Sequence, residues 1–155
     1  KRLDGTIPTT LGAMTSLKRI RLRDNLIIGV IPEEIGAATS LERIDFSDNN
    51  ITGSIPHTIG VLLKVEFLLL QNNNMSGTIP IELKALTAMT TFDAHNNGIG
   101  GAIYLFYLLE SMTEYLPNVM LFINDDICLR SGRCAPTRDD RSHVADSPHL
   151  ERQCD

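Results

Sequence analysis

The stretch LERIDFSDNNITGSIPHTIGVLLK, residues 41–64, determines how the rest of the chain can be interpreted. Related copies precede and follow it at a constant spacing, which is the distance from Leu17 to Leu41. Each copy shares an apolar first residue, then an Asn, a Gly and, in all but the last, a Pro: Leu17, Leu41, Val65 and Met89; Asn25, Asn49, Asn73 and Asn97; Gly29, Gly53, Gly77 and Gly101; Pro32, Pro56 and Pro80. A fixed period of this length predicts a solenoid, in which each repeat buries its apolar edge against its neighbours.

Within one copy, the residues LERIDFS predict a short strand. Ile44 and Phe46 alternate with polar residues, so these two side chains face one side and the polar residues between them face the other. Stacked copies place such strands side by side in a parallel sheet. The segment 57–63, HTIGVLL, is long enough for about two helical turns, which we expect on the outer face.

The Asn at the end of each predicted strand has an expected structural role. Its amide can donate to and accept from backbone groups of its own and adjacent turns, replacing sheet hydrogen bonds that the bend removes. Gly53 tolerates backbone angles that a side chain would oppose, and Pro56 fixes the outgoing turn. We therefore expect an Asn ladder along the core, formed by Asn25, Asn49, Asn73, Asn97 and Asn124.

The runs NLIIGVIP, NNITGSIP and NNMSGTIP share the form NxxxGxIP. They resemble the plant-type leucine-rich repeat, and the resemblance extends over about residues 3–127. It implies an α/β solenoid: a right-handed superhelix with a parallel sheet on the inner face and short helices or 3-10 turns on the outer face. The tail DDICLRSGRC is similar to the disulfide-containing C-terminal caps of secreted members.

Alignment with this pattern predicts leucine-rich repeats over 1–127 and a C-terminal cysteine-containing cap or tail over 128–155. The half-repeat restarts the pattern with Leu116, Val119 and Leu121 before Asn124. The predicted units are a partial repeat, three full repeats, one longer repeat and this half-repeat: 1–16; 17–40, 41–64 and 65–88; 89–115; and 116–127.

The composition limits the classes of partner. The chain has 155 residues, 43% hydrophobic residues and a net charge of −5. Residues 1–24 carry six Lys or Arg against two Asp, whereas residues 25–123 carry three against ten acidic residues. The basic start is too short, and the remainder too acidic, for general nucleic-acid binding. No apolar run approaches the roughly 18 residues that a membrane span needs.

The three cysteines, Cys128, Cys134 and Cys154, all fall within the C-terminal segment 128–155. This placement indicates a disulfide-stapled terminus, and Cys128–Cys134 is the preferred bridge because five intervening residues suit a cap loop. Pairing of either with Cys154 stays open. A zinc site would need His143 or His149 as a further ligand, and we expect neither a metal nor another cofactor.

Two sequons, Asn50-Ile-Thr52 and Asn74-Met-Ser76, follow the predicted ladder residues. Both are candidate N-glycosylation sites if the protein is secreted. The same letters also arise from the repeat pattern itself, so the motif alone does not establish modification.

Strand residues that face away from the core form three predicted columns. The columns are Arg19, Arg43, Phe67, Thr91 and Asn118; Arg21, Asp45, Leu69, Asp93 and Met120; and Arg23, Ser47, Gln71, His95 and Phe122. Clustered guanidinium groups can hold carboxylates, sulfates or phosphates, and exposed apolar residues flanked by charge suit a partner. The predicted ligand-binding face comprises Arg19, Arg21, Arg23, Arg43, Asp45, Phe67, Leu69, Gln71, Asp93 and His95.

In the alternative interpretation, these arginines bind no ligand and form a solvated face, partly neutralised by Asp24, Asp45 and Asp48. Met120 and Phe122 are more simply explained as surface covered by the cap. An acid–base constellation of Thr91, Asp93 and His95 is conceivable. However, a flat row on one strand offers neither a pocket nor oxyanion donors, so we expect no enzyme.

Together these features predict a secreted or extracellular, non-catalytic binding module, or the ectodomain of a membrane protein. It would recognise a protein or peptide on its inner strand face, with a polyanionic glycan as a further option. The resemblance implies roles such as a receptor ectodomain or a secreted inhibitor of a wall-degrading enzyme. The alternative is a structural or accessory subunit that stacks on another chain through its open N-terminal edge.

Overall fold

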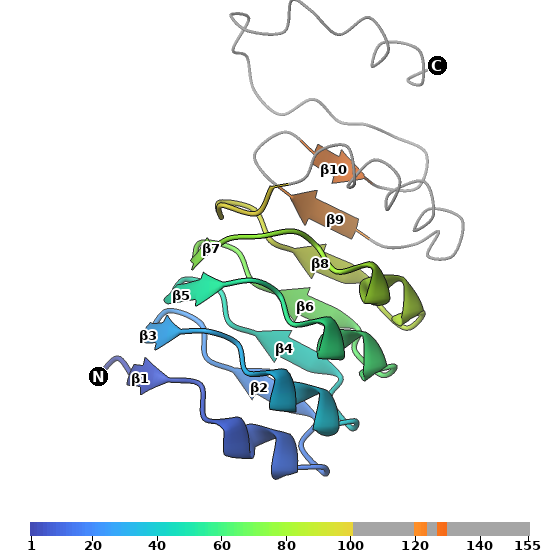
Figure 1. The fold of residues 1–155 in the computed structure, drawn as a ribbon, viewed down its shortest axis with the longest axis horizontal. Helices are drawn as coiled ribbons and strands as arrows, with labels where there is room; N and C mark the ends of the chain where they lie inside the picture. Colours follow the sequence, from blue (N-terminus) through green and yellow to red (C-terminus); the bar gives the residue numbers. More distant parts are fainter. Residues whose placement is uncertain (101–119, 124–126, 130–155) are drawn as a thin grey trace, which may run out of the picture.

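The computed structural model describes residues 1–100, 120–123 and 127–129. In these residues the chain winds through stacked turns (Figure 1), and the turns over 17–40, 41–64 and 65–88 each have an inner strand, a second short strand and a 3-10 helix. The inner strands are β2 (Arg19–Arg21), β4 (Arg43–Asp45), β6 (Phe67–Leu69), β8 (Thr91–Asp93) and β9 (Met120–Ile123), followed by β10 (Ile127–Leu129). The fold is thus the predicted leucine-rich repeat solenoid.

The inner strands form one sheet in the order β10-β9-β8-β6-β4-β2. All neighbours from β2 to β9 are parallel, as the sequence predicts, while β10 pairs antiparallel with β9. Between β2 and β8 the register equals the repeat length, so Ile20, Ile44, Leu68 and Phe92 align and all four are buried. One apolar row per turn therefore builds the core behind the sheet.

The predicted register of the last strand is wrong by two residues. β9 pairs Met120 with Thr91 and Phe122 with Asp93, whereas the sequence alignment placed Asn118 and Met120 at these positions. Because side chains alternate with period two, a slip of two residues leaves the same set facing the core. Ile123 is buried, as either register requires, so the strand pairing itself distinguishes the observed register. Asn118 and Asn124 lie outside the described residues.

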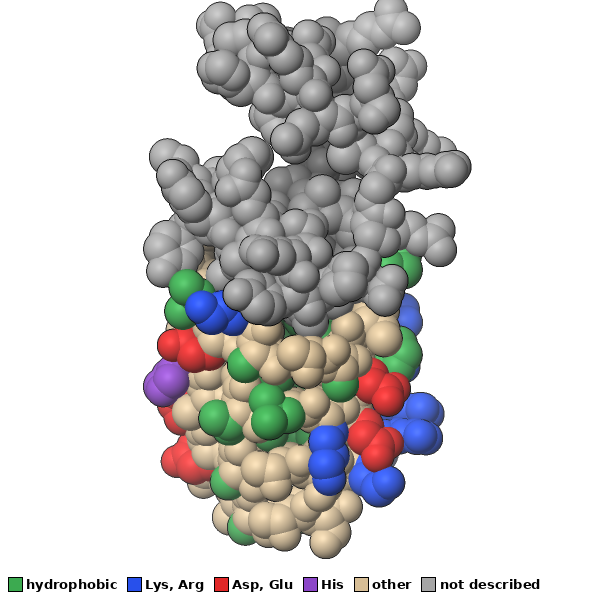
Figure 2. All heavy atoms as spheres, turned by 90° about the vertical axis from the view of Figure 1, so that its right-hand side faces the viewer, with side chains coloured by type: hydrophobic (Ala, Val, Ile, Leu, Met, Phe, Trp, Pro, Cys, Tyr) green, Lys and Arg blue, Asp and Glu red, His purple; other side chains and the backbone are tan. Residues whose placement is uncertain are grey.

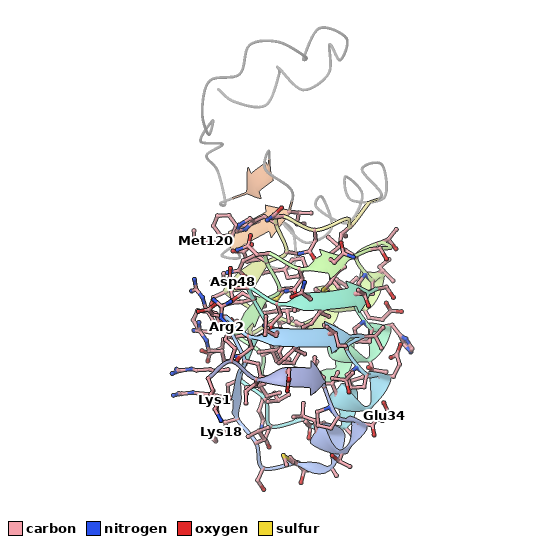
Figure 3. All side chains as sticks on the ribbon, turned by 90° about the vertical axis from the view of Figure 1, so that its left-hand side faces the viewer. Lys1, Arg2, Lys18, Glu34, Asp48 and Met120 are labelled. Atoms are coloured by element: carbon pink, nitrogen blue, oxygen red, sulfur yellow. The ribbon has the colours of Figure 1, made fainter. Side chains whose placement is uncertain are left out.

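A second parallel sheet, which the sequence analysis did not predict, lies beside the first and has the order β1-β3-β5-β7. Figure 3 views the molecule from this side. Its middle residues, Ile27, Ile51 and Met75, are buried and extend the core. Its strands are β1 (Asp4–Thr6), β3 (Leu26–Gly29), β5 (Asn50–Gly53) and β7 (Asn74–Met75).

The outer side carries short 3-10 helices, as the resemblance predicted, and the segment 57–63 contains one of them, η3 (His57–Val61). Each begins directly after a proline, and η3 closes with the Leu62 N–H donating to the Ile59 carbonyl at 3.0 Å. At Gly60 an added Cβ would lie 2.6 Å from the Glu82 carbonyl oxygen, so adjacent turns approach too closely there for a side chain. The helices are η1 (Thr9–Ala13), η2 (Glu33–Ala37), η3 (His57–Val61) and η4 (Ile81–Ala85).

The side of the molecule opposite to the second sheet has a mixed surface. Figure 2 shows small groups of hydrophobic side chains there, between charged side chains at both of its edges. Val61 and Leu63, which end and follow η3, are among the exposed large apolar residues of the described chain. Isolated exposed apolar residues are common on protein surfaces and need no partner to explain them.

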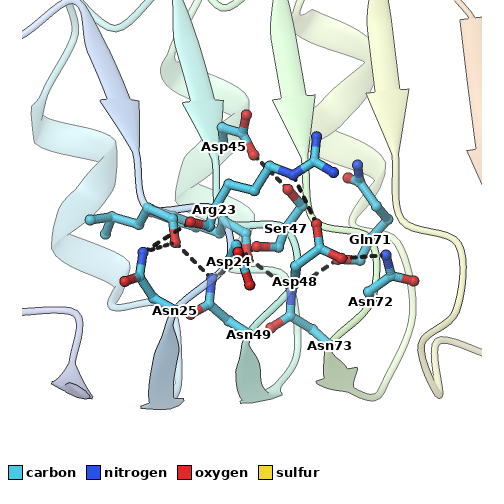
Figure 4. Close-up of polar contacts among 12 residues, drawn as sticks. Arg23, Asp24, Asn25, Asp45, Ser47, Asp48, Asn49, Gln71, Asn72 and Asn73 are labelled. Atoms are coloured by element: carbon cyan, nitrogen blue, oxygen red, sulfur yellow. Dashed lines mark hydrogen bonds and ion pairs between the residues drawn. The ribbon is translucent and has the colours of Figure 1, made fainter. Parts of the chain in front are cut away.

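The Asn side chains join consecutive turns. Asn49, which lies between Asn25 and Asn73 (Figure 4), donates from Nδ2 to the carbonyls of Leu22 at 2.8 Å, Phe46 at 3.1 Å and Ser47 at 2.9 Å. Its Oδ1 accepts from the Ile27 N–H at 3.1 Å. Equivalent bonds form in the turns above and below. The residues so placed in the described chain are Asn25, Asn49, Asn73 and Asn97.

We predict that Asn49→Ala lowers the free energy of unfolding by about 3 kcal/mol, because buried carbonyls and one N–H lose their partner. The neighbouring Asn50→Ala, which removes an exposed amide, should change it by less than about 0.5 kcal/mol. Urea unfolding of unglycosylated protein measures both. Equal losses in the two variants would contradict the assigned role of Asn49.

Candidate ligand-binding face

The register of the inner sheet determines which outward side chains are neighbours. One column runs Arg19, Arg43, Phe67, Thr91 and Met120, and the next runs Arg21, Asp45, Leu69, Asp93 and Phe122. The predicted residues of the face thus share one surface as far as β8. Beyond it, Met120 and Phe122, both half-buried, each lie one column over from the predicted place.

Several arginines at the basic end of the face are already paired with carboxylates of the chain. Arg23 Nε lies 3.0 Å from Asp48 Oδ2, and Arg19 lies 3.9 Å from Glu42. Arg21 pairs in register with Asp45 but has no carboxylate within ion-pair distance among the described residues. Arg21 is therefore the guanidinium of this cluster that is available to an outside anion.

Glu42 pairs with Arg19 of this cluster and with Lys18 beside it. Lys18 Nζ lies 2.9 Å from its carboxylate. The hydrogen bond from Lys18 is the largest cause of a lowered pKa at Glu42, ahead of the raising effect of desolvation and smaller Coulombic effects of Lys18, Arg19 and Lys64. The carboxylate thus stays ionised to lower pH and keeps Lys18 and Arg19 engaged.

Arg43 is held in place by two contacts. Its guanidinium lies 4.8 Å from the centre of the Phe67 ring and 3.5 Å from Asp45 Oδ2. Asp45 is only 6% exposed, and its Oδ1 accepts from the Ser47 hydroxyl at 2.7 Å. Cation–π stacking and the ion pair orient the same group. Arg43 and Asp45, both predicted as ligand contacts, therefore stabilise the face before any ligand arrives.

The centre of the face is apolar. Phe67 and Leu69 are both half-buried outward residues of β6, and Leu69 lies between the acidic positions Asp45 on β4 and Asp93 on β8. Gln71, two residues further on, is also half-buried, and its Oε1 has no hydrogen-bond partner among the described residues. Apolar surface bordered by charge is the arrangement that contact centres of protein interfaces show.

Asp93 and His95 bind each other. Asp93 Oδ1 lies 2.6 Å from His95 Nδ1 and also accepts from the His95 backbone N–H at 3.2 Å. Within the described chain, no three His, Cys, Asp or Glu side chains converge as metal ligands. The pair adds a polar border to the apolar centre.

A second row of linked side chains lies next to the Asn ladder, and the sequence analysis missed it. Asn72 Nδ2 donates to Asp48 Oδ1 at 2.7 Å (Figure 4), and Asn96 Nδ2 donates to Asn72 Oδ1 at 2.9 Å. These residues and Asp24 adopt positive φ between 52° and 58°. The sequence did contain a signal for this row, because an Asp or Asn directly precedes each ladder Asn, and both residue types tolerate a positive φ. The row borders the ligand face beyond the carboxyl ends of its strands.

The remaining predicted sites lie elsewhere. Asn50 and Asn74 are exposed residues of β5 and β7, on the second sheet and not on the inner one. Cys128 lies in β10, whereas Cys134 and Cys154 fall outside the described residues. The Cys128–Cys134 bridge and both sequons therefore stay predictions.

Known proteins resemble this chain in sequence pattern and fold. The leucine rich repeat family model matches residues 15–75, while no curated protein matches. The BIR2 ectodomain from Arabidopsis thaliana is 33% identical with a TM-score of 0.61, over 63% of this chain and 52% of that one. The Arabidopsis receptor kinase HAESA ectodomain, in complex with an N-terminal extended IDA peptide hormone ligand, is 27% identical with a TM-score of 0.72, over 84% and 22%. The plant peptide hormone receptor RGFR1, in complex with RGF2, is 27% identical with a TM-score of 0.69, over 80% and 19%.

The chain therefore carries plant-type leucine-rich repeats and folds as a leucine-rich repeat solenoid. It spans about half the length of the BIR2 ectodomain and a smaller share of the two hormone receptors. In the part of the chain that the structure describes, no helix is long and apolar enough to cross a membrane.

We predict that Lys18→Ala raises the pKa of Glu42 towards its ordinary value, because it removes the largest stabilising contact of the carboxylate. Lys64→Ala, which removes the weakest contribution, should raise it less. A pKa that is lowered in the folded state stabilises the fold above the unfolded pKa, and this contribution fades as pH falls through the folded value. NMR titration of the Glu42 carboxyl measures both variants. An unchanged titration in Lys18→Ala would show that Glu42 does not engage Lys18 in solution.

Proposed function

We propose that the chain is a non-catalytic binding module that recognises a protein or peptide on the inner strand face. The observation that carries the proposal is the juxtaposition of the free Arg21 with the apolar centre at Phe67 and Leu69. An anionic group of the ligand pairs with Arg21 while its apolar side chains cover β6. Arg43 and Asp45 hold the surface between these two contacts.

The similar ectodomains support this kind of ligand. HAESA and RGFR1 are described in complex with an IDA peptide hormone and with RGF2. An extended peptide suits a flat sheet surface, because side chains alternating along it reach neighbouring columns. A polyanionic glycan would use Arg21 and the exposed sides of Arg19 and Arg23 but would leave Phe67 and Leu69 idle.

The proposed location is extracellular. Two sequons at exposed positions and three cysteines confined to the C-terminal segment 128–155 support it. The similar BIR2 chain is likewise described as an ectodomain.

A second candidate function, that of a stacking subunit, has its own observation. Leu3 and Met14, in the first turn, are 57% and 54% exposed, and β1 and β2 are the outermost strands of their sheets. Repeats stacked on this edge would cover these groups and continue both sheets. Sedimentation of the isolated chain distinguishes the two functions, because a monomer at all concentrations contradicts stacking.

We predict that Arg21→Gln and Leu69→Thr each weaken binding of a captured extracellular peptide or protein about tenfold, the effect of losing roughly 1.4 kcal/mol of contact energy. The partner is first captured from extracellular fluid of the source and its affinity is then measured by biolayer interferometry. Lys84→Gln is the charge-matched control, because Lys84 is exposed in η4 on the outer face.

Melting temperatures within about 2 °C of the parent chain show that the two inner-face variants remain folded. Unchanged affinity in both of them would contradict the inner face as the binding surface. If Arg21→Gln abolishes binding to a sulfated polysaccharide and Leu69→Thr does not, the ligand of the inner face is a polyanion and not a peptide.

A further inference from the structure

An apolar strip runs along the outward side of the β3 turn. Leu26, Ile28 and Val30 alternate with inward residues and are 47%, 53% and 55% exposed. One repeat later the same positions hold polar residues, and two repeats later they do so again: Asn50, Thr52 and Ser54; Asn74, Ser76 and Thr78. The strip is thus confined to one turn of the second sheet, and an exposed apolar patch of this kind indicates that something covers it.

The sequon Asn50-Ile-Thr52 lies directly beside this strip. The register of β3 and β5 pairs Ile28 with Asn50, and both side chains are exposed on the same side of the sheet. Neighbouring strands are about 4.8 Å apart, so a group attached to Asn50 begins within one strand spacing of Ile28. The Thr52 hydroxyl donates to the Gly29 carbonyl at 3.1 Å, which ties the sequon to the β3 turn.

The two consecutive asparagines of this turn differ in chemical availability. Asn49 is 8% exposed and its Nδ2 donates to three backbone carbonyls, so its amide is occupied by the ladder. Asn50 is exposed at the surface of the second sheet. Of the two, only Asn50 combines an accessible amide with a Thr two residues later.

We propose that Asn50 carries an N-linked glycan whose first sugars cover the strip formed by Leu26, Ile28 and Val30. The proposal rests on the extracellular location in the proposed function. In the transfer, Nδ2 of Asn50 forms a bond to the anomeric carbon of a glycosyl polyisoprenyl pyrophosphate donor. The carbon–oxygen bond to the pyrophosphate breaks, the pyrophosphate takes the electron pair, and Nδ2 loses one proton to a base.

Asn74 supplies a matched comparison. It occupies the same position one repeat later, is exposed and has a Ser two residues on. Its register partner is Thr52, and the equivalent positions of the following turn are Gly98 and Gly100. Among the described residues a glycan at Asn74 therefore has no apolar strip beside it, so the two sequons differ in what their sugars touch rather than in their motif.

The test uses the full chain secreted from a eukaryotic host. Glycopeptide mass spectrometry should find Asn50 modified. Asn50→Gln should raise the fluorescence of an apolar dye, anilinonaphthalene sulfonate, on the order of twofold, because it uncovers the strip. Asn74→Gln should leave the fluorescence unchanged. Ile28→Thr, which installs the residue found at this position in the next repeat, should reverse the increase when combined with Asn50→Gln.

An unmodified Asn50 in the secreted protein would overturn the modification. A modified Asn50 whose Gln variant binds no more dye than Asn74→Gln would overturn the covering of the strip. If the chain without a glycan at Asn50 self-associates through the strip, then a second copy of the chain covers the strip, and the glycan does not. Partner capture by the inner face, measured on the same Asn50→Gln protein, should not change, so failure of this inference leaves the proposed function standing.

Discussion

The structure depends on one constraint: after each inner strand from β2 to β8, an Asn amide must satisfy backbone groups that the turn would leave unpaired. Asn49 does this for three carbonyls and one N–H, and the contacts extend from its own turn to the preceding one. A buried polar group without a partner costs folding free energy, so every turn needs such a residue. Neighbouring turns are therefore joined by polar contacts as well as by apolar packing.

This constraint separates scaffold from surface. Residues that build the turn, such as Ile44, Phe46 and Asn49, are buried and occupy positions that keep their character from repeat to repeat. Outward strand residues are free to vary, and they do: Arg21, Asp45, Leu69 and Asp93 occupy a single column. The second sheet shows the same separation, because Ile27 is buried while its neighbours Leu26 and Ile28 are exposed. We therefore expect functional residues at the outward positions, whose residue type the repeat pattern does not constrain.

The sequence predicted the solenoid, the parallel inner sheet and which side chains share its outer columns, because the constant spacing fixes the register wherever repeats are regular. It failed at β9, where Met120 pairs with Thr91, since an alternating pattern reads equally well after a slip of two. It also missed the second sheet, whose strands span only two to four residues. The sequence could not predict which side chains of the face contact one another. That Arg43 stacks on Phe67 while Arg21 stays free follows from side-chain geometry, which the repeat spacing does not determine.

The central claim is that ligands are recognised on the inner strand face by residues that the scaffold does not need. Hydrogen–deuterium exchange of the chain, free and bound to its captured partner, tests this claim most directly. The account predicts added protection in peptides that contain β2, β4 and β6, with none in the 3-10 helices of the outer side or in β3 and β5. Protection confined to η2 and η3, or to the second sheet, would contradict it.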